Sequence, residues 1–213
     1  MTVPYVPYSG IPRRQPQHPP VLLPSGPEAA ELTGPVFGPA AVGPLDHDLT
    51  RQHAGEPRGE RITVSGRILD RRGRPVRGQL IEIWQANAAG RYAHPADRNP
   101  APPDPDFTGT GRCLTDDEGR YRFTTIRPGA YPVDTSWRPA HIHFSLFGTA
   151  FAQRLVTQMY FPGDPLLARD GIHHAVHDPA ARRRLIAAHD PALGYRWDVV
   201  LDGPRATWTE GTR

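Results

Sequence analysis

Short apolar runs that alternate with turn residues dominate the chain from Arg61 onward. Residues 61–69 alternate in part, residues 70–78 are rich in turn formers, and residues 79–84 resume the apolar pattern, which together predict strand–turn–strand. Only residues 178–190 predict a helix, with Asp178 as N-cap and Pro179 in the first turn. The further runs that predict strands are 121–126, 141–147, 154–161 and 195–201. Six or so strands with one short C-terminal helix favour an all-β fold, an antiparallel β-sandwich of the prealbumin-like type.

Proline separates the N-terminal part from this pattern. Eleven of the 26 prolines fall in residues 1–45, where apolar residues follow no sustained period. Such composition is typical of an extended arm with little regular structure. We therefore expect an arm with a short helical segment over residues 1–60 and a β-sandwich catalytic domain over residues 61–213.

Charge and cysteine content exclude several classes of protein. All 25 basic residues are arginine, but 22 interspersed acidic residues leave a formal net charge of only +3, so we expect no nucleic-acid partner. Cys113 is the single cysteine, which excludes an intramolecular disulfide and favours a reducing compartment. The first residues lack the apolar core of a signal peptide, and no run is long enough to span a membrane. The expected location is the cytoplasm.

The segment HIH, with His141 and His143, is the sharpest local feature. Residues i and i+2 of a strand face the same side, so two imidazoles there can converge on one metal ion. No glutamate follows closely, as an Fe(II) or Zn(II) site of the cupin type would require. The only carboxylate close to HIH in sequence is Asp134, in a probable loop, so the best remaining oxygen donors are phenols, and the nearby tyrosines are Tyr92, Tyr131 and Tyr160. Phenolate is a hard anionic ligand, so this donor set favours Fe(III).

A rival cluster, HHAVH, contains His173, His174 and His177. We expect it to lie in a loop before the predicted helix, without a strand to fix its geometry. Surface histidines are the simpler interpretation of this cluster, although the sequence leaves its role open.

Motif blocks along nearly the whole chain resemble the intradiol ring-cleavage dioxygenases. They include ELTGPVFG, GERITVSGRILDRRGRPV, EIWQANAAGRYAH, DPDFTGTGRCLTDDEGRYRF, TIRPGAYP, WRPAHIHFSLFG and RLVTQMYFPGDPL. The resemblance implies a non-haem Fe(III) enzyme that opens a small aromatic diol with O2. It is greatest to the branch that cleaves protocatechuate to 3-carboxy-cis,cis-muconate, and that branch works as a hetero-oligomer of α and β subunits.

The resemblance also implies roles for individual residues. The iron ligands would be Tyr92, Tyr131, His141 and His143, with Tyr131 and His143 as the axial pair. Tyr131 would also act in catalysis by taking a substrate proton. The other implied positions are Arg138 and Gln158 for catalysis, and Tyr8, Arg138 and Tyr160 for substrate binding.

The chain departs from its branch of the family after Tyr131. The loop YPVDTSWRPAH is about three residues shorter than expected and has Val133 where the family carries tryptophan. One wall of the substrate pocket therefore differs, which leaves catechol and hydroxyquinol open as substrates. A non-catalytic β-sandwich subunit is the alternative from another class, and the four retained ligands argue against it. For Arg138, a salt bridge to a loop acid is an equally open alternative to a catalytic role.

Overall fold

The computed structural model describes residues 42–147 and 154–210. Short strands are the main regular structure in this part of the chain, which agrees with the predicted all-β class. The strands are β1 (Arg61–Leu69), β2 (Leu80–Trp84), β3 (Thr110–Leu114), β4 (Arg120–Ile126), β5 (Tyr131–Val133), β6 (Ser136–Arg138), β7 (His141–Phe147), β8 (Arg154–Tyr160), β9 (Ala188–Asp190), β10 (Gly194–Arg196) and β11 (Val199–Val200). The helical elements are the 3₁₀ helix η2 (Pro165–Arg169), α2 (Gly171–Ala175) and α3 (Pro179–Arg184).

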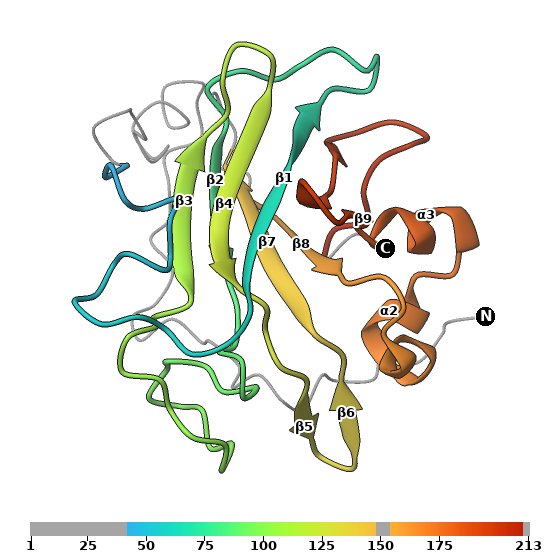
Figure 1. Ribbon diagram of the computed structural model, residues 1–213. Helices are drawn as coiled ribbons and strands as arrows, with labels where there is room; N and C mark the ends of the chain where they lie inside the picture. The colour runs from blue at the N-terminus through green and yellow to red at the C-terminus, as the bar shows by residue number, and fades with distance from the viewer. Residues whose placement is uncertain (1–41, 148–153, 211–213) are drawn as a thin grey trace, which may run out of the picture.

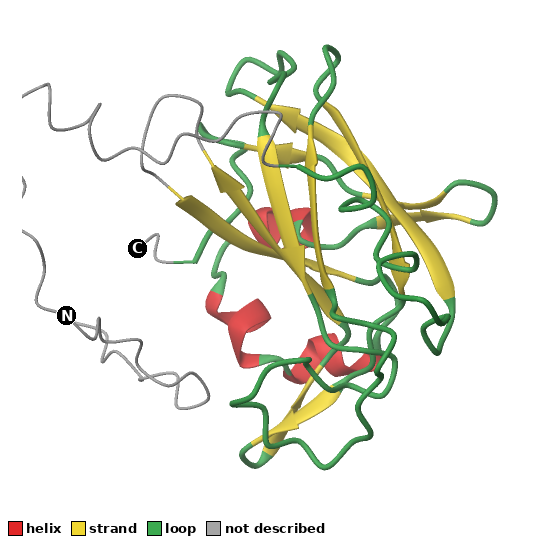
Figure 2. Ribbon diagram, turned by 90° about the vertical axis from the view of Figure 1, so that its left-hand side faces the viewer, coloured by secondary structure: helices red, strands yellow, loops and turns green. Residues whose placement is uncertain are grey.

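Two sheets form the sandwich (Figures 1 and 2). In the first, β1 lies between β4 on one side and β10 and β11 on the other, and β9 pairs with β10. The second sheet has the order β3-β2-β7-β8, with every pair antiparallel. Because β1 pairs in parallel with β10 and β11, the first sheet is mixed rather than purely antiparallel.

Aromatic side chains hold the two sheets together. Phe144 of β7 is fully buried, and its ring centroid lies 4.8 Å from that of Trp197 and 6.3 Å from that of Phe123 in β4. Edge-to-face packing of this kind adds to the free energy gained by burying the rings. Leu49, from the segment before β1, is also fully buried, and its N–H donates to the carbonyl of Thr124 in β4. The core therefore includes the end of the predicted arm.

The strand–turn–strand prediction is confirmed for both strands, but the two strands do not pair with each other. β1 runs over the predicted residues with alternating burial, but β1 and β2 belong to different sheets. The turn at Asp70 folds back for a single bridge between Leu69 and Pro75. β4 pairs with β1 over seven register pairs. After the turn, the chain therefore crosses to the other sheet, where it forms β2, instead of forming a hairpin with β1.

The helix predicted over residues 178–190 begins where expected but ends early. The side chain of Asp178 accepts from the N–H groups of Ala180 and Ala181, as an N-cap does. α3 ends at Arg184, since Leu185 and Ala187 form backbone hydrogen bonds with Tyr160 at the end of β8. Residues 188–190 then form β9. Tertiary pairing with β8 and β10 has replaced the second half of the predicted helix.

A separate two-stranded hairpin, β5–β6, leads directly into β7 at the lower end of the sandwich in Figure 1. Its register places Tyr131 opposite Arg138. At the other end of the chain, the carbonyl of Trp208 accepts from the Thr157 hydroxyl and Glu210 N–H donates to Val156, so the C-terminal segment lies along β8. No helix in the described part of the chain is long and apolar enough to cross a bilayer.

Candidate metal centre

The structure brings the four predicted ligands together. His141 and His143 project from one face of β7, with their Nε2 atoms 3.2 Å apart. The phenol oxygen of Tyr131, at the start of β5, lies 3.4 Å from Nε2 of His141. The ring of Tyr92 meets that of Tyr131 edge-on, with centroids 5.5 Å apart, and lies 6.4 Å from the ring of His143.

Neighbouring groups determine the orientation of His141. Its Nδ1 lies 2.7 Å from the carbonyl oxygen of Pro139, which can only accept, so Nδ1 carries the proton and donates. In the neutral ring, Nε2 then presents a lone pair toward His143 and Tyr131. An imidazole held in this way is a typical metal ligand.

His143 is held by stacking. Its ring lies parallel to that of Trp84 on the neighbouring strand β2, at 4.6 Å and 3°. Its Nδ1 lies 3.9 Å from a carboxylate oxygen of Glu210, too far for a hydrogen bond. Burial, followed by the charge of Arg138, lowers the pKa of His143 to about 3. Burial together with the charges of Arg138 and His143 also lowers the pKa of His141, so both rings are neutral near pH 7.

A tightly built loop carries Tyr92. The side chain of Asn87 accepts from the N–H groups of Ala89 and Arg91, and the N–H of Tyr92 donates to Asp97 over 2.7 Å. Gly90 has a φ of +84°, and a Cβ there would lie 2.2 Å from the carbonyl oxygen of Ala130. Only glycine lets this loop pass so close to the residue before Tyr131, which explains how Tyr92 reaches the site.

The donor set fits a ferric ion. Two imidazole Nε2 atoms at 3.2 Å need a positive atom between them, either a shared proton or a metal ion, because facing lone pairs repel. The two phenol oxygens supply the hard anionic donors that Fe(III) prefers. No group of three or more His, Cys, Asp or Glu side chains in the described ranges offers a competing site. The fit therefore rests on the mixed tyrosine–histidine set.

A buried polar network borders this centre. Nη2 of Arg138 donates to Oε1 of Gln158 over 2.5 Å and lies 3.3 Å from the hydroxyl of Tyr160. Gln158 and Tyr160 pair in register with His143 and His141, respectively. The amide of Gln158 also donates to Glu210 over 2.5 Å.

Arg138 forms a salt bridge to an acid, as one of the two alternatives expected. Its Nε lies 3.1 Å from Oδ1 of Asp170, at the junction of η2 and α2. The same guanidinium also contacts Gln158, so the ion pair and a role at the centre are compatible. Sequence reasoning missed Asp170 and Glu210. The position of Asp170 directly before GIHHA matches an N-cap, a signal that was present in the sequence.

The rival histidine cluster differs from expectation. His173 and His174 lie in the short helix α2, not in a loop, and His173 is buried with only 7% exposure. The Asp170 cap starts this helix, and packing against Tyr160, with ring centroids 5.2 Å apart, covers His173. The expectation of a surface loop was wrong for His173, whereas His174 and His177 are exposed.

Comparison with known proteins identifies the family of the chain. A family model described as "Dioxygenase" matches residues 32–203. The protocatechuate 3,4-dioxygenase beta chain of Burkholderia cepacia is 54% identical over 212 residues, covering 94% of this chain and 89% of the relative. This chain belongs to the intradiol ring-cleavage dioxygenase family.

More distant members of the family are also similar. The catechol 1,2-dioxygenase of Candida albicans is 32% identical over 73% of this chain, but the match spans only 54% of that relative. The protocatechuate 3,4-dioxygenase alpha chain of Pseudomonas putida is 30% identical over 70% of this chain and 75% of its own length. The dioxygenase domain of a carbohydrate-binding fusion protein from Streptomyces sp. SirexAA-E superposes with a TM-score of 0.56 at 29% identity, covering 81% of this chain and 96% of that domain.

In this intradiol dioxygenase the segment after Tyr131 forms a short hairpin, where the family resemblance predicts a longer loop. Val133 lies opposite Ser136, and Asp134 closes the turn with a φ of 49°. Val133 shares the face of Tyr131, since alternate residues of a strand point the same way, while Trp137 is 53% exposed on the other face. Tyr8, the predicted contact to the substrate carboxylate, lies outside the described residues.

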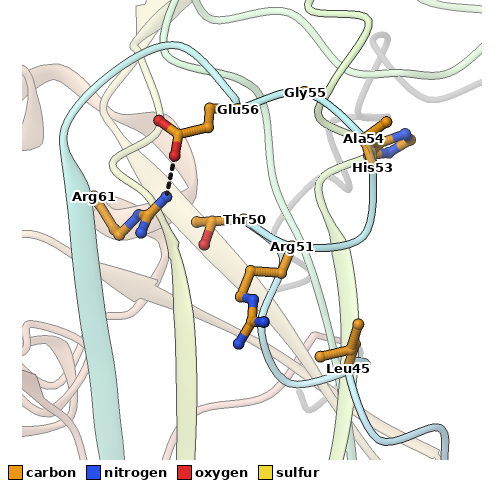
Figure 3. A pocket seen from close by; sticks show the side chains of 8 residues that line it. All are labelled: Leu45, Thr50, Arg51, His53, Ala54, Gly55, Glu56 and Arg61. Carbon is orange, nitrogen blue, oxygen red and sulfur yellow. Dashed lines mark ion pairs between the residues drawn. The ribbon is translucent and has the colours of Figure 1, made fainter.

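An open cavity of about 370 Å³ lies elsewhere, between the segment before β1 and the start of that strand (Figure 3). Arg51, His53 and Arg61 line it, and Arg61 pairs with Glu56 at 4.0 Å. None of the four candidate ligands reaches this cavity, so its size is no guide to the chemistry of this dioxygenase.

Proposed function

We propose that the chain cleaves protocatechuate (3,4-dihydroxybenzoate) between its two hydroxylated carbons with O2, giving 3-carboxy-cis,cis-muconate in the catabolism of aromatic compounds. Both oxygen atoms enter the product, so no external reductant is consumed. The observation that carries the proposal is that Nε2 of His141 lies 3.2 Å from Nε2 of His143 and 3.4 Å from the phenol oxygen of Tyr131. The 54% identity to a protocatechuate 3,4-dioxygenase beta chain supports the choice of substrate.

Tyr92, Tyr131, His141 and His143 would hold the metal as Fe(III). When bound, such an ion acts as a Lewis acid that favours loss of protons from the diol oxygens. Tyr131, as its tyrosinate, would accept one of these protons, a role supported by the 3.4 Å between its phenol oxygen and Nε2 of His141. Burial keeps both histidines neutral, which maintains their lone pairs for the metal.

Arg138 and Gln158 would act on the substrate side. A buried guanidinium is a fixed positive charge, and in a water-poor environment it stabilises negative charge that develops on the reacting ring and oxygens. Gln158 orients that guanidinium through the 2.5 Å contact with Nη2. Tyr160 and Tyr8 would contact the substrate. Burial, with Asp170 as the second cause, raises the pKa of Tyr160 far above its usual range, so Tyr160 would act as a neutral hydrogen-bonding group.

The similarity to both an alpha and a beta chain supports a second subunit. We propose that this chain is the iron-bearing β partner of an α subunit in a cytoplasmic hetero-oligomer. The active preparation should therefore be the co-purified complex rather than this chain alone.

The test is the visible absorption spectrum of the iron-loaded complex, before and after anaerobic addition of protocatechuate. Tyrosinate bound to Fe(III) should give a broad red-brown band that shifts on addition. Admission of O2 should then give a tricarboxylic acid that is heavier than protocatechuate by two oxygen atoms. A band that responds to catechol or hydroxyquinol but ignores protocatechuate would change the substrate. A complex that stays colourless after iron loading would contradict the enzyme reading and favour a structural subunit.

A further inference from the structure

Asp170 is a buried carboxylate next to the proposed centre. It lies between η2 and α2 with its side chain fully covered, and Arg138, which is also buried, is its ion-pair partner. Two buried charges are tolerated only when each is paired and hydrogen-bonded. A pair of this kind determines how its members are oriented.

The contact between the two side chains involves two atoms on each. Nε of Arg138 lies 3.1 Å from Oδ1 of Asp170, and Nη2 lies 3.5 Å from Oδ2. A guanidinium held along one edge by a carboxylate has little freedom to rotate. Its Nη2 therefore points toward the hydroxyl of Tyr160 and the amide oxygen of Gln158.

The backbone in turn holds Asp170 in place. Its Oδ1 accepts from the N–H of Ile172, its N–H donates to Leu167, and its carbonyl accepts from His174. The carboxylate is thus tied to the start of α2 before it meets Arg138. On the opposite side, Arg138 pairs in register with Tyr131 across the β5–β6 hairpin.

We infer that Asp170 is a positioning residue for the reaction: it holds the Arg138 guanidinium against Gln158 and Tyr160, beside the two histidines of β7. The inference rests on the proposed function for its catalytic consequence. The ion pair itself is independent of that function. Asp170 does not touch the proposed ligands, so removing its charge should leave metal binding intact.

The experiment compares Asp170→Asn with Asp178→Asn in the iron-loaded complex. Asparagine keeps the size and the capping ability of both residues. Asp178 caps α3 in the same way but is exposed and pairs with Arg184, not Arg138. We expect Asp170→Asn to lower kcat about 10- to 100-fold, as loss of an orienting partner typically does, with KM, iron content and the visible band nearly unchanged. Asp178→Asn should keep wild-type kcat, and Asp170→Glu should recover part of the loss.

A second measurement needs no activity. Urea unfolding of the complex with Asp170→Asn, Arg138→Gln and the double variant gives a double-mutant cycle. The double variant should lose less stability than the two single losses added together, because it leaves no unpaired buried charge. If Asp170→Asn alone does not fold, folding of the double variant would show the same coupling, because it too leaves no unpaired buried charge.

The outcomes separate the two proposals. If the wild-type complex cleaves a catechol and Asp170→Asn matches Asp178→Asn in kcat, Asp170 has no positioning role. Simple additivity in the urea cycle would overturn the coupling between Asp170 and Arg138. If the wild-type complex cleaves no catechol, the proposed function fails, and the urea cycle still decides whether the pair is coupled.

Discussion

The chain has two pairs of neighbouring histidines, His141 with His143 on β7 and His173 with His174 on α2. Each pair has a buried member, but the rings of the two pairs are oriented differently. His141 is 2% exposed and His173 is 7% exposed, so burial does not distinguish them. On β7, two residues apart, His141 and His143 turn their Nε2 atoms to within 3.2 Å. On α2, the adjacent His173 and His174 have ring centroids 5.9 Å apart and planes at 89°.

Backbone geometry explains the difference. Side chains two apart on a strand share a face, whereas neighbours on a helix diverge by about 100°. The existing contacts also differ, since Nε2 of His174 donates to the carbonyl oxygen of Ala168 and its Nδ1 accepts from Arg182. The spacing of histidines predicts a metal site only after the backbone type is known.

The largest expected effect is on iron content, which should distinguish the histidines of β7 from those of α2. His141→Ala should lower iron per chain by more than about tenfold, because it removes a donor from a set of four. His174→Ala should leave iron content unchanged. Metal analysis of both purified complexes gives the answer, and iron loss in His174→Ala would show that the α2 cluster binds the metal.

Tyr131→Phe tests whether the two histidines of β7 act together with the tyrosine of the β5–β6 hairpin. Removal of the phenol oxygen that lies 3.4 Å from His141 should lower turnover about 100-fold or more, since the proposed proton acceptor is lost. Tyr195→Phe is a matched control, because that buried tyrosine lies in β10 of the first sheet and its hydroxyl contacts Arg127, just after β4. O2 uptake with protocatechuate measures both variants. Near-normal turnover of Tyr131→Phe would remove Tyr131 from the proposed chemistry.

In the metal-free protein, replacing His141 or His173 by phenylalanine compares how much each buried histidine contributes to the unfolding free energy. His141→Phe leaves the carbonyl of Pro139 without its donor, which should cost about 1–3 kcal/mol of unfolding free energy. Neither ring nitrogen of His173 forms a hydrogen bond of good geometry within the described structure, so His173→Phe should change stability by less than about 1 kcal/mol, or stabilise. Urea unfolding compares the two, and a larger loss for His173→Phe would indicate an unrecognised partner.

The smallest effect is expected at the exposed histidine of α2. His174→Ala removes contacts of 3.0 Å to Ala168 and 3.2 Å to Arg182, both exposed to water. Its unfolding free energy should fall by no more than about 1 kcal/mol. Thermal unfolding monitored by circular dichroism is sufficient. A loss several times larger would mean that α2 depends on this side chain.

Much of the fold was predictable from the pattern of apolar residues. The first strand runs over the predicted residues, and the start of the helix at Asp178 is also as predicted. β3 was missed because small residues occupy its buried positions, among them Gly111, where a Cβ would lie 2.5 Å from Leu49. Local pattern does not report such close packing between distant segments.

For the candidate site, the sequence by itself determined the donor types, the spacing of the HIH pair and the family through its ordered motifs. Tertiary structure alone decided that Tyr92 and Tyr131 meet that pair, that β1 and β2 lie in different sheets, and that Arg138 pairs with Asp170. Each of these depends on contacts between residues far apart in the chain. Such contacts form because burial of apolar surface brings the two sheets together, and the buried charges must then find partners within the fold.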